Sequence, residues 1–165
     1  MSQHPLYFIS IIAPGGIRKD IEAFKKEVKE KYKAKHALKL PAHITLQIPF
    51  RMDEKQEKIL LKELEKFAAA QESFEVELDG FGKFSRNVIF VKVVDHEPIK
   101  KLYKKLQKLI QKQLELKEHE KTEKIHPHLS IASRDLKREL FAGAWADFKD
   151  REYKANFIAK SITLL

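Results

Sequence analysis

The sequence predicts an α+β fold of two pseudo-symmetric lobes, each with an antiparallel-rich sheet that faces a central cleft, and with helices outside. Three observations predict it. Strand-like and helix-like segments alternate along the chain, one order of elements occurs twice, and each copy carries a short histidine motif in its second strand. The chain has 165 residues, enough for one domain with a proper core. We therefore expect a single domain built from two pseudo-repeats, at about 5–80 and 86–165.

The first half begins with a buried strand over Tyr7–Ala13, which is rich in β-branched and aromatic residues and ends at a Pro-Gly-Gly turn. Apolar residues three or four apart predict an amphipathic helix over Ile17–Tyr32. Polar and apolar residues then alternate over His43–Ile48, which predicts a half-buried strand. Asp53 is expected to cap the next helix, and Phe74–Leu78 is the third predicted strand.

The second half repeats this order. Val88–Val94 is predicted to be a strand, and Pro98 marks the start of a helix with a long leucine-rich stripe. The polar segment Lys117–Lys124 is expected to be a mobile connection, with a lid as the alternative. His128–Ala132 is the next predicted strand, and a helix separates it from the strand-like segment Phe157–Leu165.

Composition limits the possible functions. The 33 Lys and Arg residues and the 24 Asp and Glu residues give a net charge of +9, which favours a polyanionic partner unless the lysines only solvate helix faces. The absence of cysteine excludes disulfides, a thiol nucleophile and thiolate metal ligands. The apolar runs are too short to span a bilayer and no signal peptide is visible. We expect a cytoplasmic protein with no membrane partner and no obligate protein partner.

Each half contributes one motif, His43-x-Thr45 in the first and His128-x-Ser130 in the second. Residues i and i+2 of a strand point to the same side, so each histidine lies beside a hydroxyl group. If a pseudo-twofold axis relates the lobes, two imidazoles and two hydroxyls face one cleft. One imidazole can act as general base and the other as general acid, while the hydroxyls donate hydrogen bonds to phosphate oxygens. This constellation indicates displacement at phosphorus without a metal or another cofactor.

Two other interpretations of the histidines remain open. A single histidine in a half-buried strand is more often a hydrogen-bonded structural residue, and any solvent-facing strand shows polar alternation. The repetition of the motif in both halves favours a functional role. A zinc site made of His119, His126 and His128 is the weaker alternative, because neither motif histidine has a carboxylate or cysteine at ligand spacing.

With this pair of motifs, the sequence resembles the two-histidine (2H) phosphoesterase superfamily, the 2′-5′ RNA ligase-like and cyclic phosphodiesterase family. The signature of that family is a pair of His-x-Thr/Ser motifs in strands. The resemblance covers nearly the whole chain and includes the opening strand that ends at Pro14, the segment at Phe50 and the stretch Leu78–Phe84.

The resemblance implies a bilobal fold in which His43 and His128 are the catalytic acid and base, and Thr45 and Ser130 bind phosphate. It leaves open which histidine is the base. The implied substrates are RNA ends or small nucleotide cyclic phosphates, with hydrolysis of 2′,3′-cyclic phosphates or 2′-5′ linkages as the reaction. The alternatives are 2′-5′ RNA end joining, a cyclic phosphodiesterase restricted to mononucleotides, and an RNA- or nucleotide-binding protein without turnover.

Several residues near the middle of the chain are further candidates for substrate binding. Phe81 and Phe84 flank Gly82, and either could stack a base if it is exposed, whereas core packing is the alternative for at least one of them. Lys83, Arg86 and Arg134 could hold substrate phosphates, with a solvated surface charge as the alternative for each.

Overall fold

The computed structural model describes residues 3–165. Within that range the chain forms seven strands, four α-helices and two short 3₁₀ helices. In chain order these are β1 (Leu6–Ile12), α1 (Gly15–Tyr32), η1 (His36–Lys39), β2 (His43–Arg51), α2 (Glu54–Ala69), β3 (Phe74–Phe84), β4 (Val88–Val93), α3 (Glu97–Gln113), η2 (Glu118–Glu120), β5 (His128–Ala132), α4 (Arg138–Phe148), β6 (Lys154–Ala159) and β7 (Thr163–Leu164). The α+β prediction is confirmed.

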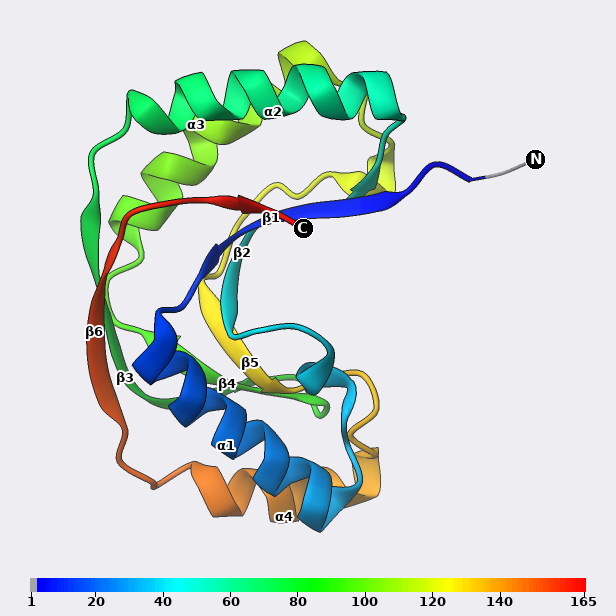
Figure 1. Ribbon diagram of the computed structural model, residues 1–165. Coiled ribbons are helices and arrows are strands. Elements are labelled where there is room, and N and C mark those ends of the chain that lie inside the picture. Colours follow the sequence, from blue (N-terminus) through cyan, green and yellow to red (C-terminus); the bar gives the residue numbers. More distant parts are fainter. Residues whose placement is uncertain (1–2) are drawn as a thin grey trace.

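The strands form two antiparallel sheets, with the orders β2-β1-β7 and β5-β4-β3-β6 (Figure 1). The sheets exchange strands between the two halves of the sequence. Strand β3, from the first half, pairs with β4 and β6 of the second half, and the C-terminal β7 pairs with β1. The prediction of one strand over Phe157–Leu165 is therefore wrong, because the chain leaves one sheet after Ala159 and enters the other at Thr163.

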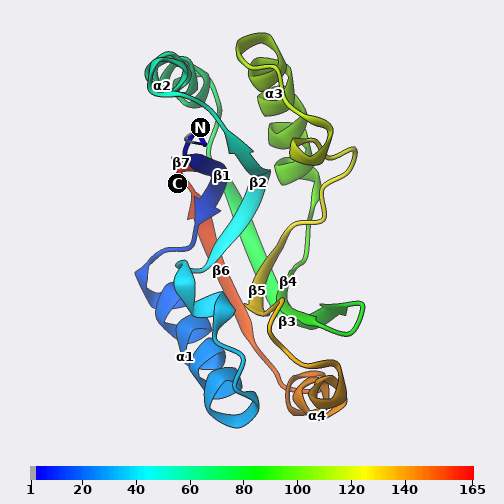
Figure 2. The same cartoon turned by 90° about the vertical axis from the view of Figure 1, so that its right-hand side faces the viewer.

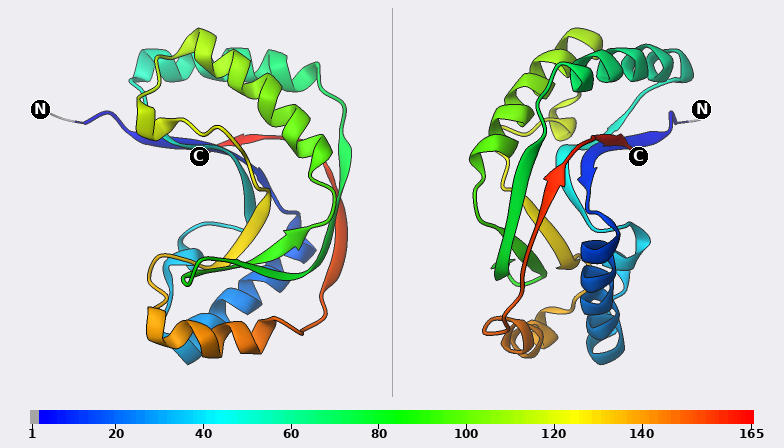
Figure 3. Two further views of the ribbon diagram at one scale, coloured as in Figure 1. Left: turned by 180° about the vertical axis from the view of Figure 1, so that it is seen from behind. Right: turned by 60° about the vertical axis from the view of Figure 1, so that its left-hand side comes forward.

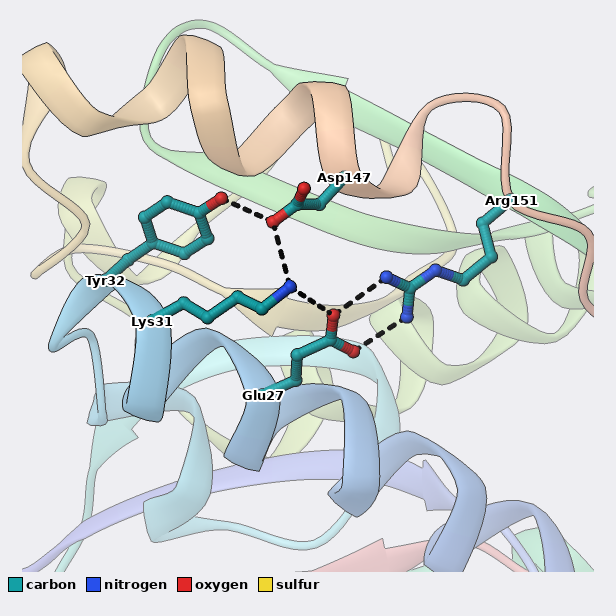
Figure 4. Close-up of polar contacts among 5 residues, drawn as sticks. All are labelled: Glu27, Lys31, Tyr32, Asp147 and Arg151. Atoms are coloured by element: carbon teal, nitrogen blue, oxygen red, sulfur yellow. Dashed lines mark hydrogen bonds and ion pairs between the residues drawn. The ribbon is translucent and has the colours of Figure 1, made fainter.

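The helices pair at the two ends of the molecule, one from each half of the sequence. Figure 1 and Figure 3 show α2 beside α3 at one end and α1 beside α4 at the other. Side chains of α1, of α4 and of Arg151, which follows α4, hold the second pair together (Figure 4). The guanidinium of Arg151 donates two hydrogen bonds to Glu27, at 2.7 and 2.8 Å, and lowers the pKa of that carboxyl to about 2. Lys31 bridges Glu27 to Asp147, which also accepts a hydrogen bond from Tyr32.

The predicted cap of α2 is confirmed. The side chain of Asp53 accepts a hydrogen bond from the backbone N–H of Gln56 at 2.8 Å, and the side chain of Gln56 accepts one from the backbone N–H of Asp53 at the same distance. This capping box satisfies donors that a helix start leaves without intrahelical partners.

Strand β3 continues six residues beyond the predicted end at Leu78. Gly80 adopts a φ of 73° where the register with β4 shifts, which is a conformation that favours glycine. Gly82 lies under the ring of Phe90, and a Cβ atom there would lie 2.7 Å from two ring carbons. The two glycines therefore let β3 bend and let Phe90 pack flat against it, next to the second histidine motif.

The core lies on the side of the motif strands away from the histidines. Ile44 and Leu46 of β2 and Leu129 and Ile131 of β5 are fully or almost fully buried, whereas the motif residues between them are half-buried. Burying side chains of this size stabilises a fold by about 1.5–3 kcal/mol each. The apolar residues thereby fix which face of each strand the histidines occupy.

Candidate functional site

The two motif histidines are held by the same local contact. The Nδ1–H of His43 donates to the carbonyl of Pro41 at 2.7 Å, and the Nδ1–H of His128 donates to the carbonyl of His126 at 2.6 Å. A carbonyl oxygen can only accept, so each Nδ1 carries a proton, and the Nε2 of the neutral ring keeps its lone pair. The partner is two residues upstream in both cases, just before the strand begins.

The strands that carry these histidines lie next to each other. Each is the edge strand of its sheet, and β2 contacts β5 where the two sheets meet (Figure 2). The imidazoles interact electrostatically, because a positive charge on His43 lowers the pKa of His128. The structure thus brings together the two histidines that are 85 positions apart in the sequence.

Aromatic rings border both imidazoles. The ring of Phe8 lies 5.4 Å from that of His43, between centroids. The ring of Phe84 meets His128 edge to face at 4.9 Å, and Phe90 lies 5.2 Å from the same imidazole. Burial among these groups lowers the pKa of both histidines, because it disfavours the charged imidazolium. Phe84 therefore lies beside His128, and its role in stacking a base stays a prediction. The sequence analysis did not identify Phe8 or Phe90 as neighbours of the histidines.

The hydroxyl residues Thr45 and Ser130 are half-buried on the same strands. Within residues 3–165 neither hydroxyl has a hydrogen-bond partner, so both can donate to a ligand. Thr45 is paired with Ser10 of β1, whereas Ser130 is paired with Phe90 of β4. The Oγ atom of Ser10 is fully buried and has no hydrogen-bond partner in the described part of the chain.

A buried lysine bonds to the backbone just before the first motif. Lys25 of α1 is only 4% exposed, and its ammonium donates a hydrogen bond to the carbonyl of Leu40 at 2.9 Å. Leu40 immediately precedes Pro41, whose carbonyl holds His43. The positive charge of Lys25 also contributes to lowering the pKa of His43. The sequence held a signal for this residue, because Lys25 falls four positions after Ile21 in the apolar stripe of α1.

The segment 117–124 is anchored. The carboxylate of Glu120 is buried and accepts hydrogen bonds from the backbone N–H groups of Lys117 and Arg51, each at 2.8 Å. The Glu120 carbonyl accepts from Gln47 of β2 at 2.8 Å, and Tyr103 bonds to Thr122. These contacts attach the segment to β2 at Glu120 and to α3 at Thr122, and the mobility of its exposed residues stays a prediction.

The other candidates lie elsewhere. Phe81 is buried among aromatic residues of α1 and α4, so the core interpretation applies to it. The Lys83 ammonium lies over the ring of Phe141, 6.0 Å from its centre, on the side of α4. Arg86 and Arg134 line one hollow beyond the β3–β4 turn.

Two features are absent from the described residues: a cluster of metal-binding side chains and a helix that could span a membrane. Between residues 3 and 165, no three His, Cys, Asp or Glu side chains gather as a set that could hold a metal ion. None of the helices in that range has the length and apolar character to cross a bilayer.

The protein thus has two lobes that exchange strands, and each of two adjoining strands carries one histidine and one hydroxyl residue. The sequence matches the family model of the 2'-5' RNA ligase superfamily over residues 14–165. The chain belongs to this superfamily, as the resemblance of its motifs indicated.

Two curated relatives from Geobacillus carry the name "Putative phosphoesterase". The first, from Geobacillus sp. (strain WCH70), is 30% identical over 134 residues, which is 79% of this chain and 72% of the relative. The second, from Geobacillus kaustophilus, is 33% identical over 102 residues, which is 61% of this chain and 56% of the relative.

Solved structures share the fold. The structure of TT0787 from Thermus thermophilus matches with a TM-score of 0.69 at 16% identity, over 97% of this chain and 87% of that one. The structure of E. coli LigT complexed with ATP matches with a TM-score of 0.63 at 20% identity, over 96% of this chain and 85% of that one.

Proposed function

We propose that this protein is a metal-independent phosphoesterase that acts on 2′,3′-cyclic phosphate ends or 2′-5′ phosphodiester linkages of RNA or nucleotides by general acid–base catalysis. The observation that carries this proposal is the duplicated histidine geometry. Two imidazoles on adjoining strands are fixed through Nδ1 by a carbonyl two residues upstream, and both keep Nε2 available. Membership of the 2'-5' RNA ligase superfamily and the names of the Geobacillus relatives support it, and so does the ATP complex of LigT.

In the proposed hydrolysis of a 2′,3′-cyclic phosphate, one neutral imidazole takes a proton from water as the water oxygen forms a bond to phosphorus. The bond between phosphorus and the 3′ oxygen breaks, and the second histidine, in its protonated form, gives its proton to that oxygen. The products are a 2′-phosphate and a 3′-hydroxyl. Thr45 and Ser130 donate hydrogen bonds to the non-bridging oxygens, where negative charge grows in the transition state.

The lowered pKa values of His43 and His128 suit a mechanism in which one imidazole is the base and the other is the acid. Because charge on His43 disfavours charge on His128, the pair passes through a state in which one imidazole is protonated and the other is neutral. That singly protonated pair contains one base and one acid, which is the state that the reaction requires. In the reverse reaction, the imidazole that acted as the acid becomes the base, and the one that acted as the base becomes the acid.

The test is turnover in EDTA of a nucleoside 2′,3′-cyclic phosphate and of a 2′-5′-linked dinucleotide. We expect the wild-type protein to cleave at least one of them. His43→Ala and His128→Ala should each lose roughly 10²- to 10⁴-fold in kcat. His4→Ala, which alters an exposed histidine outside the site, is the matched control and should retain full activity. Activity that survives in either motif variant, or that needs an added metal ion, would contradict the proposal.

Binding of RNA without turnover is the second candidate function, favoured by the net charge of +9 and by the basic hollow that contains Arg86 and Arg134. It predicts salt-dependent RNA binding that persists when both motif histidines are replaced, with no product. End joining is the third outcome, because the same acid and base can run the reaction in reverse. The appearance of a longer product with a 2′-5′ linkage would identify it.

A further inference from the structure

A basic hollow lies between the β3–β4 turn and the start of α4. Its volume is about 410 Å³, which falls in the range of ligand-binding pockets. Arg86 contributes to one wall from the turn, and Arg134, Lys137 and Arg138 contribute to the other from the segment that follows β5. Four cationic side chains therefore surround one space, and none of the described residues that line it carries a carboxylate.

The charges of this hollow are not neutralised by neighbours. Across residues 3–165 none of the four cations takes part in an ion pair or a side-chain hydrogen bond. Asp135 is the nearest acid in the sequence, but its carboxylate pairs with other groups. It accepts hydrogen bonds from the backbone N–H groups of Lys35 and His36, at 2.8 and 2.9 Å. Glu139, in the first turn of α4, is exposed and does not line the hollow. The four cations of the hollow are therefore available to bind an anionic ligand.

The backbone adds to this positive field. Helix α4 has eleven residues, and its N-cap residue Lys137 makes no side-chain capping bond. The N–H of Leu140 donates to the Lys137 carbonyl at 3.0 Å. The positive end of the helix dipole therefore lies at the wall of the hollow that Lys137 and Arg138 form. Together with the unpaired cations, this arrangement suits a phosphate group.

The hollow is connected to the histidine site along two strands. Phe84, whose ring contacts His128 at 4.9 Å, is followed directly by the β3–β4 turn that carries Arg86. Strand β5 runs from His128 through Ser130 toward Arg134. Figure 2 shows the β3–β4 hairpin and the connection from β5 to α4 on the same side of the molecule as β5. A nucleotide chain whose end lies at the histidines can therefore follow β5 and place a further phosphate in the hollow.

We propose that this hollow binds an internal phosphate of an RNA strand whose reactive end lies at His43 and His128, so that the preferred substrate is an oligonucleotide. This inference rests on the proposed function and narrows its substrate class. Phe84 lies between the two sites, where its ring can stack the base of an end nucleotide.

The experiment compares kcat/KM for a short RNA ending in a 2′,3′-cyclic phosphate with kcat/KM for the mononucleoside 2′,3′-cyclic phosphate. The test variant is Arg86→Ala/Arg138→Ala, which removes one cation from each wall. The matched control is Lys58→Ala/Lys62→Ala, which removes two exposed lysines of α2. We expect the ratio of oligonucleotide to mononucleotide kcat/KM to fall about tenfold in the test variant only. An unchanged ratio, or an equal fall in the control, would overturn the proposal.

Binding separates failure of this proposal from failure of the proposed function. Affinity for a short RNA without a reactive end is measured by fluorescence anisotropy at several salt concentrations. The test variant should bind more weakly, and the slope of log affinity against log salt should become shallower by about 0.7, the value for one single-strand phosphate that is no longer neutralised. Arg86→Lys/Arg138→Lys, which keeps both charges, should restore the slope. If neither substrate is turned over, the proposed function fails, and this slope alone decides whether the hollow binds RNA.

Discussion

Strands β2 and β5 hold their motif histidines by the same contacts, but the residues around the two histidines differ. Both hold a histidine by its Nδ1 atom to a carbonyl two residues upstream, and both place a hydroxyl two residues downstream. His43, however, lies against the ring of Phe8 and near the buried Lys25. His128 is bordered by Phe84 and Phe90 and lies near His126.

This difference shows how a duplicated motif can yield two distinct catalytic groups. The shared carbonyl contact fixes the tautomer and orientation of each ring, which catalysis requires of both. The unshared neighbours set how readily each ring takes up a proton. Two copies of one motif can therefore supply an acid and a base, provided that their environments differ.

The largest expected effect separates the two histidines by role. His43→Ala and His128→Ala should each lose roughly 10²- to 10⁴-fold in kcat on a 2′-5′ linkage. A phosphodiester whose leaving group is 4-nitrophenolate needs no proton on departure, so it should restore activity in only one of the two variants. That variant lacks the general acid. Equal recovery of both variants in this assay would break the comparison.

The hydroxyls should give the next largest effect. Thr45→Val and Ser130→Ala each remove one donor to the phosphoryl oxygens, and each should lower kcat roughly a hundredfold. Ser130→Thr retains the donor and should keep most of the activity. Steady-state kinetics on a nucleoside 2′,3′-cyclic phosphate would check this, and a change confined to KM would assign the hydroxyls to ground-state binding.

Removal of Lys25 should act directly on one histidine, His43. The Lys25 charge lowers the pKa of His43, so Lys25→Met should raise that pKa and move the pH profile of kcat/KM toward higher pH. Lys25→Arg keeps the charge and should leave the profile in place. A loss of activity without a shift in the profile would mean that Lys25 acts only as a support for the Leu40 carbonyl.

The smallest effect concerns stability, far from the histidines. Glu27 has a folded-state pKa of about 2, below the ordinary value of 4.5, because Arg151 donates to it. Its stabilisation is thus complete above pH 4.5 and is lost as pH falls toward 2. Glu27→Gln should lower the free energy of unfolding by about 1–2 kcal/mol at pH 7. Urea unfolding at pH 7 and at pH 3 should show a smaller difference at the lower pH.

Local sequence patterns predicted most of the fold and the central part of the site. Alternation placed β2 and β5 with their histidines on the face away from the core, and the Asp53 cap could be recognised from residue types alone. The split between β6 and β7 could not, because strand propensity runs through Phe157–Leu165 and only the tertiary fold decides where the chain changes sheets.

The residues missed at the site share one physical reason. Phe8 and Phe90 look like ordinary strand residues, and only the meeting of the two sheets places their rings against imidazoles. Glu120 lies in a run of charged residues that suggested mobility, but the fold buries its carboxylate against backbone N–H groups from β2 and its own segment. Partners far apart in the sequence give no local pattern.

The pH dependence of kcat/KM in EDTA, on a nucleoside 2′,3′-cyclic phosphate, tests the central claim most directly. Burial lowers the pKa of both histidines from the ordinary value of 6.5. The singly protonated pair is therefore most populated below that value, because its maximum lies at the mean of the two pKa values. We predict a bell-shaped profile with its maximum below pH 6.5. A rate that is flat across this range, or that rises steadily with pH above 7, would contradict acid–base catalysis by His43 and His128.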